Sequence, residues 1–263
     1  MGTYAIGDIH GCYAELQRML ERISFSDADR LILLGDYVDR GPDSLAMLRW
    51  LERSPPNVTA IRGNHDDSFV SNVELLELVD GEEGLDTDPA SPGDAAALYD
   101  TAKYVLARHD PPADLLLDPY GTLDRLVHKQ GVTLADLRRW AERIQAMPCF
   151  ARLSAGGREW VAVHAGFKEG GFSDEAEAKD FFMNARGKLC WQDAPPHVSI
   201  VAGHTPTLSH KLPGAGEGRV YRHYSPDRDV LFYDIDCGCA YRKQFPNGRL
   251  ACLRLEDEAV FYV

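Results

Sequence analysis

The amino-acid sequence predicts an α/β fold with an inserted set of helices. Short apolar strands alternate with amphipathic helices over the first third of the chain, helical patterns dominate from residue 67 to about 148, and strands return in the last half. A chain of 263 residues is long enough for one large domain that carries a sizeable insertion. We therefore expect one domain over residues 1–263, with a helical insertion or cap over residues 69–148.

The first third of the chain predicts a β–α–β–α–β unit. The apolar run 31–34 is bounded by Arg30 and Gly35, which is typical of a strand buried on both faces of a sheet. Strands are also expected over 4–6 and 57–61, and helices over 13–23 and 44–53. Consecutive units of this kind form parallel strands with right-handed crossovers.

The middle of the chain has few strand signals. Helical patterns lie near 68–79, 95–108, 121–130 and 133–147, and acidic or proline-rich breaks separate them at 80–94 and 110–114. Thr133, with an acid at Asp136, resembles a helix N-cap. Because the segment is too long for an ordinary crossover, we interpret it as a cap that borders the site formed by the strand ends before it.

Strand patterns resume after the insertion. Residues 151–153 and 160–163 predict a hairpin around Gly156-Gly157. Residues 198–202 predict a single strand. The last four strands are expected over 219–223, 230–235, 250–255 and 260–263, and we interpret them as one C-terminal meander.

Composition and charge restrict the possible partners. The formal net charge is −13, from 28 basic and 41 acidic residues, so nucleic acid and anionic membranes would repel the chain unless a basic patch or a metal intervened. No apolar run reaches the roughly 18 residues of a membrane-spanning helix, and the N-terminus has no signal-peptide pattern. We expect a cytoplasmic protein with no nucleic-acid and no membrane partner; the sequence sets no oligomeric state.

The six cysteines, at positions 12, 149, 190, 237, 239 and 252, do not have the spacing of a small disulfide framework. Cys237-Gly238-Cys239 is compatible with a metal clip, but we prefer two half-buried thiols at a strand-to-loop junction. Cys12 is interpreted as a small buried hydrophobe at the start of the first helix rather than a redox switch. The thiols are therefore expected to be reduced.

Polar residues flanked by glycine follow five of the expected strands. The fragments are Gly7-Asp8-Ile9-His10-Gly11, Gly35-Asp36-Tyr37-Val38-Asp39-Arg40-Gly41, Gly63-Asn64-His65-Asp66, His164-Ala165-Gly166 and Gly203-His204-Thr205. In open α/β sheets, ligands bind beyond the carboxyl ends of the strands. We therefore expect six side chains to meet at one edge: Asp8, His10, Asp36, Asn64, His164 and His204.

These six side chains offer carboxylate, imidazole and amide donors and no thiolate. Such donors suit Mn²⁺, with Fe or Zn as alternatives, and not a structural cysteine-type zinc site. Six donors are too many for one catalytic ion, but they fit two divalent ions that share a carboxylate and bridge a hydroxide nucleophile. Asp36 is the candidate bridge, with Asp8 and His10 on the first ion and Asn64, His164 and His204 on the second.

The five fragments, in this order, resemble the motifs of the calcineurin-like metallophosphoesterases, specifically the phosphoprotein phosphatase branch. The resemblance covers roughly residues 1–68 and 148–263 and leaves out the insertion. It implies an αββα sandwich of two mixed sheets and the hydrolysis of phosphoric esters. It also implies that the six donors are the metal ligands, that His65 is the general acid, that Asp39 pairs with and orients His65, and that Arg40 binds phosphate.

Two features depart from the phosphatase pattern. The third motif ends in Asp66, as in relatives that cleave dinucleoside polyphosphates, whereas Asp39 is typical of the protein phosphatases. The family's second phosphate-binding arginine is missing from the matching stretch, Trp191-Gln192-Asp193. Arg186 and Arg222 are the candidate replacements.

Three functions follow from these features. The first is a two-metal phosphoprotein phosphatase that acts on phosphoserine, phosphothreonine or phosphotyrosine. The second uses the same site to hydrolyse diadenosine tetraphosphate or a similar dinucleotide, so the expected partner is either a phosphorylated protein or a small phosphoester. The third is a metal-binding regulatory module without activity, which the complete donor set disfavours.

Overall fold

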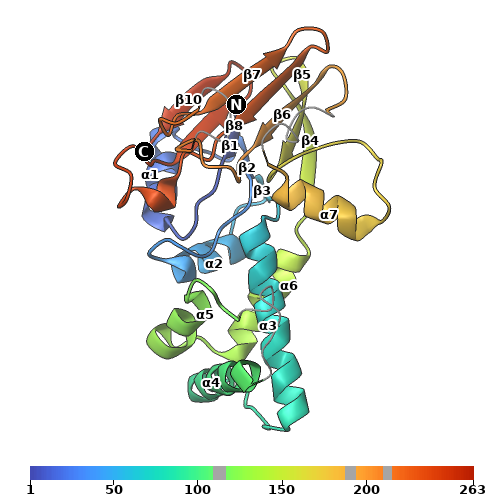
Figure 1. The fold of residues 1–263 in the computed structure, drawn as a ribbon. Helices are drawn as coiled ribbons and strands as arrows, with labels where there is room; N and C mark the ends of the chain where they lie inside the picture. Colours follow the sequence, from blue (N-terminus) through green and yellow to red (C-terminus); the bar gives the residue numbers. More distant parts are fainter. Residues whose placement is uncertain (109–116, 187–193, 210–214) are drawn as a thin grey trace.

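Two five-stranded sheets face each other and carry helices on their outer faces (Figure 1). The computed structural model describes residues 1–108, 117–186, 194–209 and 215–263. Both sheets contain parallel and antiparallel pairs. This is the expected α/β architecture, an αββα sandwich of two mixed sheets.

The first sheet contains the predicted β–α–β–α–β unit. Its strand order is β10 (Ala259–Tyr262), β9 (Ala251–Arg254), β1 (Thr3–Ile6), β2 (Arg30–Leu33), β3 (Val58–Ala60). Strands β1, β2 and β3 are parallel, and α1 (Tyr13–Arg22) and α2 (Ser44–Glu52) connect them. The sequence therefore predicted this half of the sheet correctly.

The second sheet is built from the strands that follow the insertion. Its order is β4 (Phe150–Ala155), β5 (Arg158–Val163), β6 (Val198–Ala202), β8 (Val230–Asp234), β7 (Tyr221–Ser225). Strands β4 and β5 form the predicted hairpin. Strands β5, β6 and β8 are parallel, so their carboxyl ends lie at the same edge.

The predicted C-terminal meander is wrong. Strands β7 and β8 pair with each other in the second sheet, whereas β9 and β10 return to the first sheet, where β9 pairs antiparallel with β1. Strand β9 covers the edge of β1 that β2 leaves open, so the backbone groups on that edge of β1 are hydrogen-bonded. Hydrophobic periodicity identified the four strands but carried no information about their partners.

Alternating side chains explain why the sheets pack in layers. In β1, Tyr4 and Ile6 face the helices of the outer layer, while Ala5 enters the core between the sheets. In β5, Trp160 faces the second sheet's inner side and is 1% exposed, while Val161 faces outward. Strands β1 and β5 therefore bury side chains on both faces, as expected for interior strands of a sheet covered by helices.

The insertion consists of helices that extend away from the sheets (Figure 1). They are α3 (Asn64–Glu83), α4 (Pro92–Arg108), α5 (Thr122–Asp124), the π-helical turn η1 (Arg125–Lys129) and α6 (Leu134–Gln145). Helix α3 begins inside the third motif rather than after it, so the motif lies on the first helical turn. Helix α6 starts at the predicted cap, where Thr133 Oγ1 accepts a hydrogen bond of 3.1 Å from the backbone of Asp136.

Helix α7 (Glu175–Asn184) was not expected from the sequence. The side chain of Asp174 accepts a hydrogen bond from the backbone of Glu177 and thereby caps the N-terminus of α7. Phe182 and Phe167 lie at a ring distance of 5.7 Å and join the core on the outer face of the second sheet. The cap residue was the available signal, but the helix is short and its apolar stripe is interrupted by acids.

The cysteines are free thiols in the part of the chain that the structure describes; Cys190 lies outside it. Cys12, Cys237 and Cys239 are each at most 2% exposed, so the last two are more deeply buried than expected. Cys12 occupies the N-cap position of α1, in agreement with its interpretation as a buried hydrophobe. None of the described helices is both long and apolar enough to cross a membrane.

Candidate metal centre

The six predicted donors meet where the two sheets face each other. Asp8, Asp36 and Asn64 come from the loops and the helix start that follow strands of the first sheet, and His164 and His204 follow strands of the second. The site thus lies between two facing sheet edges and not at one edge. Five of the six donors are at most 6% exposed, and Asn64 is partly exposed: Asp8, His10, Asp36, His164, His204.

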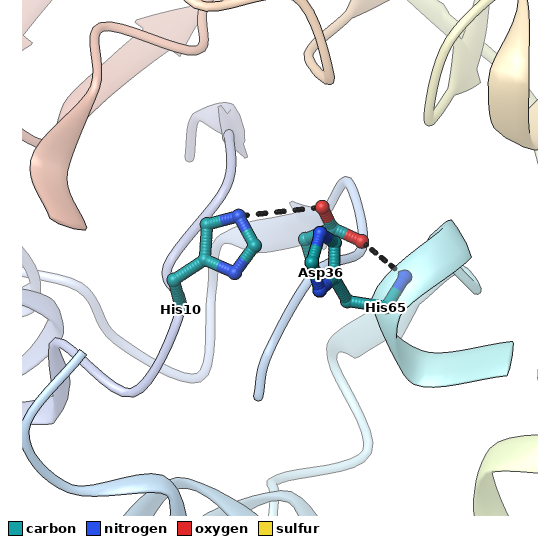
Figure 2. Close-up of side chains that lie close together, drawn as sticks. All are labelled: His10, Asp36 and His65. Atoms are coloured by element: carbon teal, nitrogen blue, oxygen red, sulfur yellow. Dashed lines mark hydrogen bonds and ion pairs between the residues drawn. The ribbon is translucent and has the colours of Figure 1, made fainter. Parts of the chain in front are cut away.

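Asp36 lies at the centre of the site. Its Oδ2 atom is 3.3 Å from Nε2 of His10, and its Oδ1 atom is 3.4 Å from Nε2 of His164. Oδ1 also accepts a hydrogen bond of 3.0 Å from the backbone of His65 (Figure 2). One carboxylate therefore reaches donors from both sheets, which is the arrangement expected of a bridging ligand.

A second set of donor atoms converges beside Asp36. Nε2 of His164 lies 3.1 Å from both Oδ1 of Asn64 and Nδ1 of His204, and the latter two atoms are 2.9 Å apart. Donors bound at about 2.1 Å to a single ion lie roughly 3.0–3.4 Å from one another. The observed distances fit the edges of one coordination shell.

The hydrogen bonds of the histidines set which nitrogen can bind a cation. Nδ1 of His10 is 2.8 Å from the carbonyl of Val38, and Nδ1 of His164 is 2.7 Å from the carbonyl of Leu34. A carbonyl only accepts, so both protons are on Nδ1 and both Nε2 lone pairs face the site. Nε2 of His204 is buried and has no hydrogen-bond partner among the described residues. The donor set fits divalent cations.

Burial keeps the imidazoles in the form that binds metal. It lowers the pKa of His10 to about 4 and that of His204 to about 2, and it also lowers the pKa of His164. These histidines are consequently neutral at physiological pH. Neutral imidazole is the ligand form, so no proton has to be displaced when a metal binds.

The carboxylates concentrate negative charge in the same place. Burial and the charges of Asp236 and Asp36 raise the pKa of Asp8. Buried carboxylates at this density need compensating positive charge, which bound cations supply.

Asp236 is a member of this group that sequence reasoning missed. It is 4% exposed, and burial followed by the charge of Asp36 raises its pKa to about 6, against a hydrogen bond from the backbone of Gly238. It lies two positions after β8, the third parallel strand of the second sheet. Asp236 could have been predicted in the same way as the six donors, from its position directly after an expected strand.

The loops that carry the site are held in an unfavourable backbone conformation. Five site residues have positive φ angles: His10 (47°), Asp36 (55°), Asp39 (68°), Arg40 (60°), His204 (68°). Left-handed geometry costs a non-glycine residue roughly 1–3 kcal/mol and persists only where its surroundings enforce it. The concentration of such residues marks the loops as built for a site.

Asp66 enforces part of this geometry. It is fully buried, and its carboxylate accepts hydrogen bonds from the backbones of Asp36 (2.7 Å), Tyr37 (2.8 Å) and Gly63 (3.0 Å). These bonds tie the second motif to the third. The sequence had offered Asp66 only as a family marker, whereas the structure gives it a positioning role.

The structure brings together the residues expected to act on the substrate. Nδ1 of His65 lies 2.6 Å from Oδ2 of Asp39, as the motif resemblance implied. The guanidinium of Arg40 contacts Nε2 of His10, and its carbon lies 5.3 Å from the ring centre of Tyr120 and 5.5 Å from that of Tyr241. Arg40 contacts the donor His10 and the backbone of His65 bonds to the donor Asp36, so these groups adjoin the donor set.

The two candidate second arginines have different positions. Arg186 is exposed two residues after the end of α7, and it lies near enough for its charge to add to burial in lowering the pKa of both His164 and His204. Arg222 is on β7, where its Nε donates to Tyr233 and Glu258 at 2.8 Å and 3.0 Å. Arg186 is therefore the better placed of the two; the stretch 191–193 lies outside the described residues.

Comparison with models of protein families shows which family this chain belongs to. The model of the calcineurin-like phosphoesterases matches residues 1–234. The chain belongs to this family. It is a metal-dependent phosphoric ester hydrolase, which sets aside the module without activity.

Several curated relatives of this calcineurin-like phosphoesterase have the same name, symmetrical bis(5'-nucleosyl)-tetraphosphatase. The protein from Dechloromonas aromatica is 30% identical over all of this chain and 96% of its own length. The protein from Photorhabdus laumondii is 28% identical over 99% and 96% of the two chains. The protein from Cellvibrio japonicus is 55% identical over 67 residues, a quarter of each chain.

Solved structures confirm the fold. A protein named provisionally as a diadenosine tetraphosphatase superposes with a TM-score of 0.55 at 22% identity, covering 100% of this chain and 93% of its own. A serine/threonine phosphatase from Saccharomyces cerevisiae gives a TM-score of 0.53 at 11% identity, covering 100% of this chain and 79% of its own. At these identities, the likeness concerns the architecture alone.

Gly203→Ala tests the donor set. A Cβ atom at this position would overlap Oδ2 of Asp8, whose two oxygens accept from the backbone of His204 at 3.1 Å and 3.0 Å. We expect Mn²⁺ affinity, measured by titration calorimetry on metal-stripped protein, to fall about 10- to 100-fold. Gly81→Ala on α3, where a Cβ meets nothing within 4 Å, is the control. Unchanged affinity in folded Gly203→Ala protein would contradict the placement of Asp8.

Proposed function

We propose that this protein hydrolyses dinucleoside polyphosphates, with water cleaving the bond between the two middle phosphates of a tetraphosphate to give two nucleoside diphosphates. The observation that carries the chemistry is the contact of the buried Asp36 carboxylate with His10 on one side and with His164 on the other, where His164 in turn meets His204. The names of the relatives that match the whole chain support the substrate class. This choice replaces the phosphoprotein as the first candidate substrate.

We assign the donors to two divalent ions. Asp8, His10 and Asp36 would hold one ion, and Asp36, Asn64, His164 and His204 the other. When bound, the ions supply Lewis-acid stabilisation of the phosphoryl oxygens and an acidified water as nucleophile. Mn²⁺ is the first choice because nitrogen and oxygen donors are mixed and thiolates are absent, with Fe and Zn as alternatives.

The remaining groups would bind the phosphoryl group and move a proton. Arg40 and Arg186 carry guanidinium groups on the rim of the site, each able to bond two phosphoryl oxygens. His65 presents Nε2 to the leaving oxygen, because its Nδ1 is bonded to Asp39. Asp39 holds the ring in that orientation, so His65 can give its proton to the departing phosphate oxygen as the bond breaks.

A cationic pocket beside Arg40 favours a substrate with several phosphates. The pocket has a volume of about 310 Å³, and its charged lining consists of Arg40, Arg125, Arg242 and Lys243. Arg242 is paired with Glu15, whereas Lys243 is exposed. A phosphorylated side chain carries one phosphate, which the metal site itself would bind. A tetraphosphate carries further negative charges, and such a pocket can neutralise them in a chain whose net charge is −13.

An apolar hollow lies close to the same arginine. Tyr241, whose ring is 5.5 Å from the Arg40 guanidinium, lines a hollow of about 260 Å³ together with Phe245, Leu208 and Pro206. Phe245 is 49% exposed, so an aromatic face is open to solvent. Phosphate-binding cations next to an exposed aromatic ring suit a nucleotide, whose base can stack.

A substrate panel tests the proposal. With Mn²⁺ supplied, we expect diadenosine tetraphosphate to give ADP as its only nucleotide product, at a higher kcat/KM than phosphopeptides of all three residue types. His65→Asn should lower kcat by roughly 10²–10⁴, and a chelator should abolish turnover until Mn²⁺ is restored. A higher kcat/KM on a phosphopeptide would return the assignment to the protein phosphatases.

The pocket makes a separate prediction. Lys243→Gln should raise KM for diadenosine tetraphosphate roughly 3- to 5-fold, since one exposed cation is removed from bound phosphates. The KM for p-nitrophenyl phosphate, which has a single phosphate, should stay unchanged. Lys103→Gln, which removes an exposed lysine of α4 that does not line this pocket, is the matched control. An equal effect of Lys243→Gln on both substrates, or no effect on either, would exclude the pocket as a polyphosphate site.

A further inference from the structure

The helical insertion reaches the pair formed by Asp39 and His65. Oγ1 of Thr122 is 2.6 Å from Oδ1 of Asp39, and the other oxygen of this carboxylate is 2.6 Å from Nδ1 of His65. Thr122 is 2% exposed and Asp39 is 7% exposed, so water does not compete for these bonds. Each oxygen of Asp39 therefore has its own partner: Thr122, within the insertion, and His65, on the first turn of α3 before the insertion begins.

The direction of the Thr122 bond is defined by its neighbours. An ionised carboxylate only accepts, so the hydroxyl donates to Asp39. The guanidinium of Arg125 donates in turn to Oγ1 of Thr122 at 3.3 Å. The hydroxyl thus acts as donor and acceptor at once, and its proton points at Asp39.

A buried carboxylate fixes Thr122 in place. Oδ1 of Asp118 accepts from the backbone of Thr122 at 2.6 Å, and its Oδ2 accepts from the backbone of Asp124 at 2.9 Å and from the hydroxyl of Tyr99 at 3.0 Å. Tyr99 belongs to α4 and is 1% exposed. The position of Thr122 is therefore set by the helices of the insertion.

The same segment makes a second contact with the acid pair. The ring of Tyr120 lies 4.8 Å from the ring of His65 and 5.3 Å from the guanidinium carbon of Arg40. Two side chains of the insertion, separated by one glycine, thus contact this group: Thr122 contacts Asp39, and Tyr120 contacts His65 and Arg40. A segment that only shielded the site from solvent would not need a polar bond to Asp39.

We propose that Thr122 is a positioning residue that acts on His65 through Asp39. The inference rests on the proposed function, in which His65 is the proton donor. The terminal torsion of a carboxylate is soft, so one hydrogen bond leaves the Asp39 plane free to rotate. The bond from Thr122 removes this freedom and keeps the His65 ring aimed at the leaving oxygen. The insertion therefore completes the acid pair.

The test uses aryl phosphates that differ in their leaving group. Phenolate needs a proton more than p-nitrophenolate does, so misplacement of the acid affects phenyl phosphate more. For Thr122→Val we expect kcat on phenyl phosphate to fall about 10- to 100-fold and kcat on p-nitrophenyl phosphate to change far less. KM and Mn²⁺ content should stay as in the wild type, and Thr122→Ser, which keeps the hydroxyl, should restore turnover.

Two comparisons separate positioning from a structural effect. Thr101→Val, also in the insertion, removes a hydroxyl that bonds only its own helix, and it should leave both rates unchanged. In an Asp39→Asn background, Thr122→Val should cause no further loss, because its effect passes through Asp39. If Thr122→Val does not fold, Thr122→Ala, which adds no methyl group next to the carboxylate, takes its place under the same criteria.

An equal loss on both phosphates, no loss on phenyl phosphate, or failure of the serine variant to restore it would overturn the proposal. Proton NMR provides a measurement that does not depend on turnover. The His65 Nδ1 proton should be protected from exchange with water in the wild type and in Thr122→Ser, and should lose that protection in Thr122→Val; retained protection counts against the role. If the wild type hydrolyses no phosphate ester, the proposed function fails, and the NMR comparison still decides the role of Thr122.

Discussion

Asp36 connects the two halves of this molecule. Its carboxylate lies between imidazoles that belong to different sheets, at 3.3 Å from His10 and 3.4 Å from His164, and it is 1% exposed. An ionised group in such a position is tolerable only when cations and hydrogen bonds compensate its charge. The facing of the two sheets and the sharp turns after their strands bring the compensating donors to Asp36, and the neutral histidines leave room for cations to balance its charge.

This arrangement requires unfavourable backbone conformations near Asp36. Asp36, Asp39 and Arg40 have positive φ angles within one loop, and the buried carboxylate of Asp66 holds the start of the loop by accepting hydrogen bonds from the backbones of Asp36 and Tyr37. Strain of this kind persists where the surroundings over-determine the geometry. The helical insertion contributes to the same loop from the other side, through the bond between Thr122 and Asp39. The loop is thus restrained by the first sheet, by α3 and by the insertion together.

The strands and most of the metal donors could be predicted from the sequence, because short apolar runs form the strands and the residues directly after them lie at the strand ends. Glycine-flanked Asp8, His10 and Asp36 follow apolar runs, and parallel strands must bring their ends together. The pairing of β9 with β1 could not be predicted, because periodicity identifies a strand but not its neighbour. Asp236 was missed although it follows a predicted strand. Thr122 had no sequence signal at all, since its bond to Asp39 spans 83 positions and depends on how the insertion folds.

The central claim is that the donors hold two ions with Asp36 between them. The most direct measurement is a crystal structure of the Mn²⁺-loaded protein with anomalous scattering recorded for the metal. The account predicts two peaks about 3.5–4 Å apart, one beside His10 and Asp8 and one beside Asn64, His164 and His204, with one oxygen of Asp36 facing each. A single peak, or a pair of peaks that Asp36 does not join, would contradict it.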